Sequence, residues 1–198
     1  MKRFTIAAAL LLAAGAARAQ DMPLADVLID GEGWKPVEKS AASLLTVVKE
    51  LKVRGSHVVR AEDLKAAGLV EPSGMVLWPD GGTLVVGDAD GKHLWAFRLD
   101  KDGKPVDGDR YYPLRMRPGE KASRVRGLAV DQAGRVYACT PQGVQVFDPT
   151  GRLSGVMLRP CDGELTAAAF GGATGDTLFV LCGDQVFARK TRAKGVAK

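Results

Sequence analysis

The sequence is poor in the residues that most often carry catalysis and metal binding. Its 198 residues include two histidines, His57 and His93, and three cysteines. Nothing in the sequence places either histidine beside a nucleophile, which argues against serine–histidine or cysteine–histidine catalysis. The C-x-x-C pairs and Cys/His spacings typical of zinc sites do not occur. These scarcities argue against two common kinds of catalytic and structural site.

The three cysteines leave one unpaired whatever their pairing. Cys139 and Cys182 end equivalent apolar segments and are predicted to be small buried residues. One disulfide is possible in an oxidising compartment, and the sequence does not choose its members among Cys139, Cys161 and Cys182.

One long apolar run occurs, and it lies at the N-terminus. Lys2 and Arg3 precede an Ala/Leu-rich stretch over 6–17, and Ala17-Arg18-Ala19 follows the A-x-A pattern of a cleavage site. The run is shorter than the roughly 20 residues that span a bilayer. The pattern predicts a secretory signal peptide at 1–19 and an exported protein, periplasmic or secreted. No later segment is a candidate membrane span.

The basic excess is small once the signal peptide is removed. Lys2, Arg3 and Arg18 belong to it, so the formal net charge falls from +5 to about +2. Much of the remaining excess lies near the C-terminus, where 191–198 is expected to form a solvated basic tail. Without a basic folded face interleaved with aromatics, nucleic acid is not an expected partner, and neither is a membrane after cleavage.

Three stretches repeat one pattern: an apolar strand, a Gly/Asp turn, a second strand, and a third strand ending near an aromatic. Their terminal aromatics are Phe97, Phe147 and Phe187, which lie 50 and 40 residues apart. This spacing is that of a four-stranded propeller blade. Turn signals such as Pro79–Gly82 and Asp107–Gly108 fall between the predicted strands.

The segment before these repeats, residues 20–57, is less regular. Ala25–Asp30 is predicted to be an opening strand, and Ser40–Lys52 fits either a strand or a helix. Val58–Ala61 is predicted to be the outer strand of a preceding blade, and Glu62–Gly68 a helical turn ended by glycine.

The amino-acid sequence of the repeats resembles that of the senescence-marker-protein/gluconolactonase family, the six-bladed propellers that include regucalcin and bacterial lactonases. Pro72–Gly81 is similar to its "PNGLAFSPDG" stretch, and Gly127–Pro149 to "DGMAVDAEGRLYVATAGGVQVFDP". The resemblance implies an all-β fold, with residues 58–190 forming a partial propeller of about three blades. A six-bladed ring needs roughly twice this length. A homodimer or another partial propeller would complete the ring.

The same resemblance implies a divalent cation, usually calcium, at the mouth of the central channel. It would be held by a Glu, an Asn and an Asp. Ser73 stands in place of the Asn, and Arg126 in place of the Asp. A guanidinium offers no acceptor, and each unit of like charge about 4 Å from the ion costs about 4 kcal/mol. We therefore expect no metal site, no cofactor and no catalytic residue of the family type, and a mouth formed near Ser73, Asp88 and Arg126.

Three functions stay open at this point. The chain could be a non-catalytic or degenerate exported module for binding or assembly, a metal-dependent sugar-lactone hydrolase that completes its ring by oligomerisation, or a decayed fragment without function. A mouth that carries Arg126 and no cation would suit an anionic sugar acid. Asp88 serves equally well as a turn cap, and whether the protein is an enzyme is left undecided.

Overall fold

The computed structural model describes residues 22–38, 50–53 and 57–196. The predicted signal peptide and most of Ser40–Lys52 lie outside these ranges. The described residues form an all-β fold with two short 3-10 helices, η1 (Leu24–Asp26) and η4 (Ala61–Ala67). Among these residues, no helix is long and apolar enough to cross a membrane.

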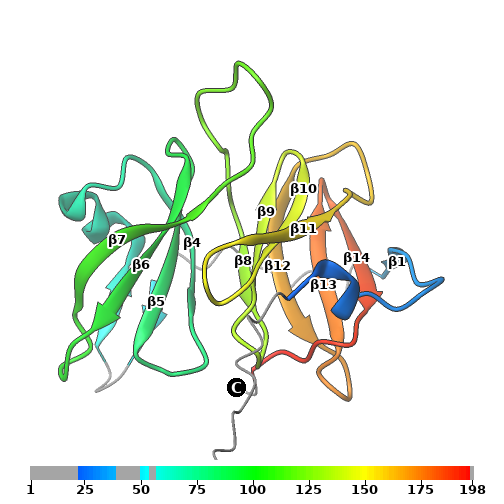
Figure 1. Cartoon of the computed structure of the whole chain (residues 1–198), viewed down its shortest axis with the longest axis horizontal. Helices are drawn as coiled ribbons and strands as arrows, with labels where there is room; N and C mark the ends of the chain where they lie inside the picture. The colour runs from blue at the N-terminus through cyan, green and yellow to red at the C-terminus, as the bar shows by residue number, and fades with distance from the viewer. Residues whose placement is uncertain (1–21, 39–49, 54–56, 197–198) are drawn as a thin grey trace, which may run out of the picture.

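Three four-stranded antiparallel sheets stand side by side (Figure 1). Sheet I contains β4 (Pro72–Leu77), β5 (Thr83–Asp88), β6 (His93–Leu99) and β7 (Pro105–Pro113). Sheet II contains β8 (Leu128–Val130), β9 (Val136–Thr140), β10 (Gly143–Phe147) and β11 (Leu153–Met157). Sheet III contains β12 (Leu165–Gly171), β13 (Thr177–Cys182), β14 (Gln185–Lys190) and β1 (Lys35–Val37). A separate hairpin pairs β2 (Glu50–Lys52) with β3 (Val58–Arg60).

The fourth strand of sheet III comes from the beginning of the chain. Pro36 of β1 lies opposite Phe187 of β14 in an antiparallel register. The predicted strand at Ala25–Asp30 is wrong: η1 occupies its first half, where the Val27 N–H donates to the Leu24 carbonyl. Val27 is buried in the apolar cluster between sheets II and III, and this packing favours the turn over an extended strand.

Sheet II is buried on both faces because its strands alternate between two apolar clusters. In β9, Val136 and Ala138 join the cluster shared with sheet I. Tyr137 and Cys139 join the cluster shared with sheet III. Successive side chains of a strand point to opposite faces, so one strand supplies both interfaces. The predicted terminal aromatics occupy equivalent third strands, and all three are buried: Phe97, Phe147 and Phe187.

The two ends of the row of sheets differ. Val59, Leu64 and Leu69, from the β2–β3 hairpin and the η4 region, pack on the outer face of sheet I. This confirms Val58–Arg60 as a strand and Glu62–Gly68 as a helical turn, which Gly68 ends with a φ of +102°. On the outer face of sheet III, a small cluster keeps four partly buried apolar residues: Val37, Ala169, Phe179 and Leu181.

The predicted turn at Asp107–Gly108 is wrong, because both residues lie within β7. Asp107 has a φ of +51°, and the pairing of β6 with β7 shifts register between Ala96 and Arg98. The two residues therefore belong to a bulge. A Cβ on Gly108 would lie 2.1 Å from a ring carbon of Phe97, which explains a glycine here. Asp107 thus has the positive φ that a turn residue often adopts, but it lies within a strand and not between two strands.

The C-terminal segment packs against the ends of sheets II and III. The Arg192 N–H donates to the Val27 carbonyl at 2.8 Å, and the Gln132 N–H donates to the Lys194 carbonyl at 2.8 Å. Thr191 and Ala193 are buried, whereas Arg192 and Lys194 are exposed. The expected solvation of this tail therefore holds for the side chains of Arg192 and Lys194. It does not hold for the backbone of Arg192 and Lys194, which bonds to Val27 and Gln132.

Candidate functional site

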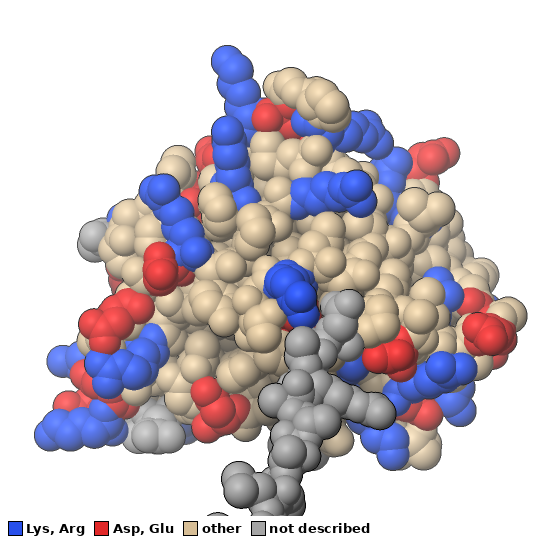
Figure 2. Space-filling view, viewed as in Figure 1, with Lys and Arg blue, Asp and Glu red and all other residues tan. Residues whose placement is uncertain are grey.

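Basic side chains gather at one end of the sheets. The β7–β8, β9–β10 and β11–β12 connections lie at this end, which is uppermost in Figure 1. In the same orientation, Figure 2 shows lysine and arginine side chains clustered there with a few acidic ones between them. We call this region, made of residues 114–127, 141–142 and 158–164, the basic end.

At the basic end, the backbone of Gly74, the residue after Ser73, bonds to that of Arg126. The Gly74 N–H donates to the Arg126 carbonyl at 2.9 Å, which joins the start of β4 to the residue before β8. Ser73 is buried, and its Oγ has no hydrogen-bond partner in the described part of the chain. Arg126 is exposed. The two predicted residues are therefore neighbours in the backbone, and only Arg126 presents its side chain to solvent.

Asp88 serves as a local brace. Its side chain is buried, and its carboxylate accepts the N–H of Glu71 at 2.8 Å and that of Val70 at 3.2 Å. Ser123 Oγ donates to the Asp88 carbonyl at 2.9 Å. These contacts fix the segment before β4 and the end of the β7–β8 connection. Asp88 thus stabilises the backbone that supports the basic end. Both oxygens of its carboxylate accept backbone N–H groups.

Three arginines, one of which is Arg126, line a single cavity. The cavity has a volume of about 140 Å³, and its walls come from three connections: Arg124, Arg126, Pro141, Arg159, Glu164 and Leu165. Within the described ranges, no carboxylate lies within ion-pair distance of Arg126. No motif in the sequence points to Arg159 or Glu164, because only the packing of sheet III on sheet II brings their connection to this place. Convergent guanidinium groups are typical of sites for carboxylates and phosphates.

Arg159 is positioned by its own connection. Its Nη1 donates to the carbonyls of Asp162 at 3.0 Å and Gly163 at 3.2 Å. Cys161 forms a disulfide with Cys182 at the end of β13, which resolves the pairing that the sequence left open. The β11–β12 connection is thereby tied covalently to the next strand pair. Cys139 is the free cysteine and is buried, as predicted.

Glu120 organises the other side of the basic end. Its carboxylate accepts the Arg117 N–H at 2.8 Å and Gln142 Nε2 at 2.7 Å. It also accepts Arg124 Nη2 at 3.3 Å. One side chain thus joins the β7–β8 connection to the β9–β10 turn. It partly neutralises Arg124, and among the residues that the structure describes, Arg126 and Arg159 are the arginines of the cavity without a carboxylate partner.

These residues do not fit a divalent cation. Hard cations need several oxygen ligands, preferably carboxylates. Both oxygens of Asp88 accept backbone N–H groups, Ser73 supplies one neutral hydroxyl, and Arg126 brings a positive charge. In residues 22–38, 50–53 and 57–196, no group of three or more His, Cys, Asp or Glu side chains could hold a metal ion. We assign no metal-dependent step to this end.

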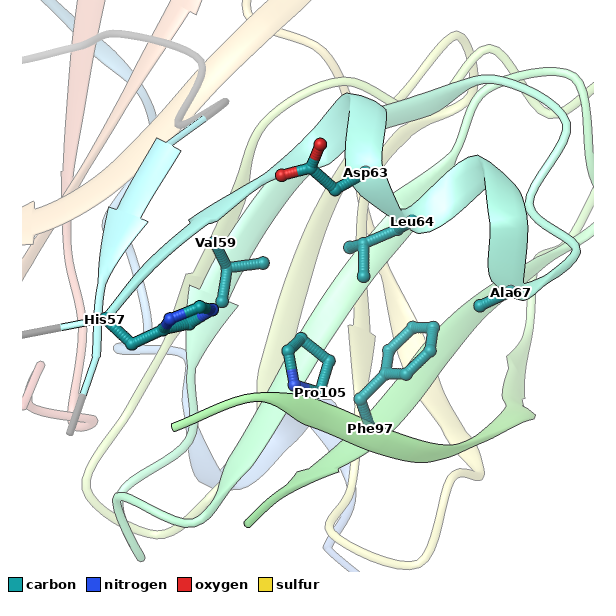
Figure 3. A pocket seen from close by; sticks show the side chains of 7 residues that line it. All are labelled: His57, Val59, Asp63, Leu64, Ala67, Phe97 and Pro105. Atoms are coloured by element: carbon teal, nitrogen blue, oxygen red, sulfur yellow. The ribbon is translucent and has the colours of Figure 1, made fainter. Parts of the chain in front are cut away.

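A separate cavity of about 340 Å³ lies between η4 and sheet I. Figure 3 shows Leu64, Phe97 and Pro105 facing one another across its floor, with His57 and Asp63 coming from different elements at its edge. No interaction between the two polar side chains accompanies this arrangement. The cavity offers mainly apolar surface, so the charged groups remain concentrated at the basic end.

Comparison with known proteins gives a consistent result. A family model described as the SMP-30/gluconolactonase/LRE-like region matches residues 50–183. A gluconolactonase of Zymomonas mobilis is 28% identical over 155 residues, which are 75% of this chain and 43% of that protein.

Solved structures of a gluconolactonase and of a regucalcin also resemble this chain. A gluconolactonase of Xanthomonas campestris is 26% identical, with a TM-score of 0.54, over 69% of this chain and 41% of its own. A calcium-binding protein, regucalcin, of Agrobacterium tumefaciens is 19% identical, with a TM-score of 0.57, over 74% of this chain and 53% of its own. The chain thus spans only about two-fifths to half of the length of these relatives.

Proposed function

Because the match covers residues 50–183, this chain belongs to the SMP-30/gluconolactonase/LRE-like family, and we propose that it is a non-catalytic binding module for an anionic sugar acid. The family resemblance seen in the sequence is confirmed, and the fold is all-β and of the family's propeller type. The observation that carries the proposal is the convergence of Arg124, Arg126 and Arg159 on one cavity.

The charges of the cavity favour a carboxylate ligand. Arg126 has no carboxylate partner among the residues described, and Arg159 bonds to backbone carbonyls through one nitrogen. Each guanidinium has five N–H donors in a planar fork, so donors remain for a ligand carboxylate. Glu164 in the same wall would repel a second anionic group but can accept a sugar hydroxyl. A sugar that places a single carboxylate in this cavity and also carries hydroxyl groups meets both conditions.

Calorimetry with gluconate and with calcium tests this proposal. We expect gluconate to bind and Arg126→Ala to weaken binding about tenfold, the value of one charge-assisted hydrogen bond. Arg98→Ala is the matched control, because Arg98 is exposed and pairs with Asp107 on sheet I. Calcium binding without any response to gluconate would overturn the proposal.

A metal-dependent sugar-lactone hydrolase is the second candidate. Its support is the similarity to the Zymomonas mobilis gluconolactonase, and it would need calcium or another divalent cation. Hydrolysis of gluconolactone that a chelator abolishes and calcium restores would establish it. The same activity in Arg126→Asp, exceeding that of the original chain, would show that the arginine had displaced a cation ligand.

The architecture is part of the proposal. Sheets I, II and III would be three neighbouring blades of a six-bladed type, and a second copy would complete the ring. The partly buried apolar face of sheet III supports a second copy at that end. At the other end the β2–β3 hairpin and η4 cover sheet I, so the second copy would contact these elements and not the sheet itself. Light scattering of the purified protein should give the mass of a dimer. A monomer would exclude completion by a second copy, and polydisperse aggregate would favour a decayed fragment.

Export is also proposed. The signal pattern at residues 1–19 and the disulfide between Cys161 and Cys182 both suit an oxidising compartment. N-terminal sequencing of the protein from the periplasm or medium should begin at Gln20. Recovery of the intact N-terminus in the cytoplasm would contradict it.

A further inference from the structure

A second hollow adjoins the arginine cavity of the basic end. It has a volume of about 440 Å³, and Arg117, Gln142, Leu158 and Asp162 are among its lining residues. Pro141 and Arg159 line both hollows, so the two are neighbours at the same end of the sheets. Together they form a basic groove, bounded by Arg126 at one end and Arg117 at the other.

The sizes of the hollows favour an extended ligand. Small-molecule sites usually measure about 300–1,000 Å³. At about 140 Å³, the cavity of Arg124 and Arg126 is below this range and suits one end group of a ligand. The adjoining hollow, at about 440 Å³, has room for a further ring.

The groove repeats its charge along its length. Arg126 lines the small cavity, Arg159 borders both hollows, and Arg117 lines the larger one. Glu120 fixes the spacing, because it accepts the backbone N–H of Arg117 and the side chains of Gln142 and Arg124. A ligand that uses all three guanidinium groups needs anionic groups at more than one position.

The rest of the lining favours a carbohydrate over a nucleic acid. Neither hollow has an aromatic side chain among its lining residues, although single-stranded nucleic acid is usually bound by base stacking on aromatics. Leu158, 76% exposed, and the rings of Pro141 and Pro160 offer small apolar surfaces. Asp162 and Glu164 can accept hydrogen bonds from sugar hydroxyls.

We propose that the basic groove binds an oligosaccharide of acidic sugars. The carboxylate of the terminal sugar binds Arg124 and Arg126 in the small cavity. The next acidic sugar lies against Arg117 in the larger hollow, with Arg159 between the two sugars. This inference rests on the proposed function and extends it from a single sugar acid to a uronic-acid oligomer.

Calorimetry with galacturonate and with tri-galacturonate tests the inference. We expect the trimer to bind at least tenfold more tightly than the monomer, because it engages a second charged contact. Arg117→Ala should reduce this trimer-to-monomer ratio to near one. Arg126→Ala should weaken both ligands, and Arg98→Ala is the control for loss of surface charge.

The outcomes separate the two proposals. Monomer binding with no gain for the trimer would overturn the oligosaccharide and leave the sugar-acid site standing. Absence of binding by either ligand would overturn both. Equal affinity for the neutral reduced or methyl-esterified trimer would contradict the role of the arginines. Tighter binding of single-stranded DNA of equal charge would assign the groove to nucleic acid and overturn the inference.

Discussion

The backbone N–H of Gly74 donates to the carbonyl of Arg126 at 2.9 Å. This contact joins the first strand of sheet I to the residue that precedes the first strand of sheet II. Ser73 is thereby held inside the fold, and the Arg126 side chain projects at the basic end. The position that the family resemblance equates with a metal ligand thus carries a guanidinium group, which has a positive charge.

Substitution of Gly74 by alanine should destabilise this junction. The added Cβ would lie 2.2 Å from the Arg126 carbonyl oxygen and 3.1 Å from Gly127 Cα, and neither backbone atom can move without shifting a strand. Overpacking of this kind costs about 1–3 kcal/mol of unfolding free energy. Urea unfolding measures the change. The control is Gly33→Ala, where no atom lies within 4 Å. Equal stability of the two variants would contradict so close an approach.

Removal of the Asp88 carboxylate should loosen the segment before β4. Asp88→Ala leaves the N–H groups of Val70 and Glu71 without their acceptor, and hydrogen bonds to a charged group contribute about 1.5–3 kcal/mol. Hydrogen exchange of these two amides should accelerate. Asp90→Ala, at an exposed position two residues later, should leave the exchange rates unchanged. An equal acceleration in both variants would deny Asp88 a specific bracing role.

The cysteines should differ in their reaction with an alkylating reagent. In the native protein none should react at pH 8, because Cys139 is buried and burial raises its pKa to about 12. Unfolding without reductant should expose one thiol, and unfolding with reductant all three. Mass spectrometry counts the labels. Two or more labels without reductant would show that the disulfide does not form.

Loss of that disulfide should lower stability and disturb Arg159. The double substitution Cys161→Ser and Cys182→Ser removes a cross-link over a sequence separation of 21 residues, and such links contribute about 2–4 kcal/mol. Thermal unfolding should show the loss. Reduction should reproduce the loss in the unsubstituted protein and in Cys139→Ser, the control that keeps the disulfide. The double variant should be insensitive to the reductant, and a further loss on its reduction would contradict the assignment.

Acid should destabilise the fold through Asp148. Burial tends to raise its pKa, but hydrogen bonds from Thr150 and Arg152 outweigh this effect and hold the pKa below its usual 3.8. A lowered folded-state pKa stabilises the protein above the unfolded value, and the contribution is lost as the pH falls through the folded pKa. The urea midpoint should therefore fall as the pH is lowered below about 3.8. Asp148→Asn should flatten this dependence, whereas exposed Asp90→Asn should retain it.

Much of the fold could be predicted from local pattern. The terminal aromatics Phe97, Phe147 and Phe187 mark the third strand of each sheet, because large apolar side chains at equivalent places of a repeat are usually buried. The turn at Pro79–Gly82 could also be predicted, since the Asp80 carboxylate accepts the backbone N–H groups of Gly82 and Thr83 there. Residues such as Asp107 and Gly108 occur both in turns and in β-bulges, so the sequence could not distinguish the bulge found here from a turn.

The sequence by itself determined the strand repeat, the family and the exchange of a ligand-type residue for Arg126. Only the tertiary structure decided that β1 joins β14, that Cys161 pairs with Cys182, and that Arg159 and Glu120 share the basic end with Arg126. The physical reason is the separation along the chain of the residues that interact. Strands and turns follow from residues a few positions apart, whereas these contacts join distant segments and arise when the sheets bury their shared apolar faces.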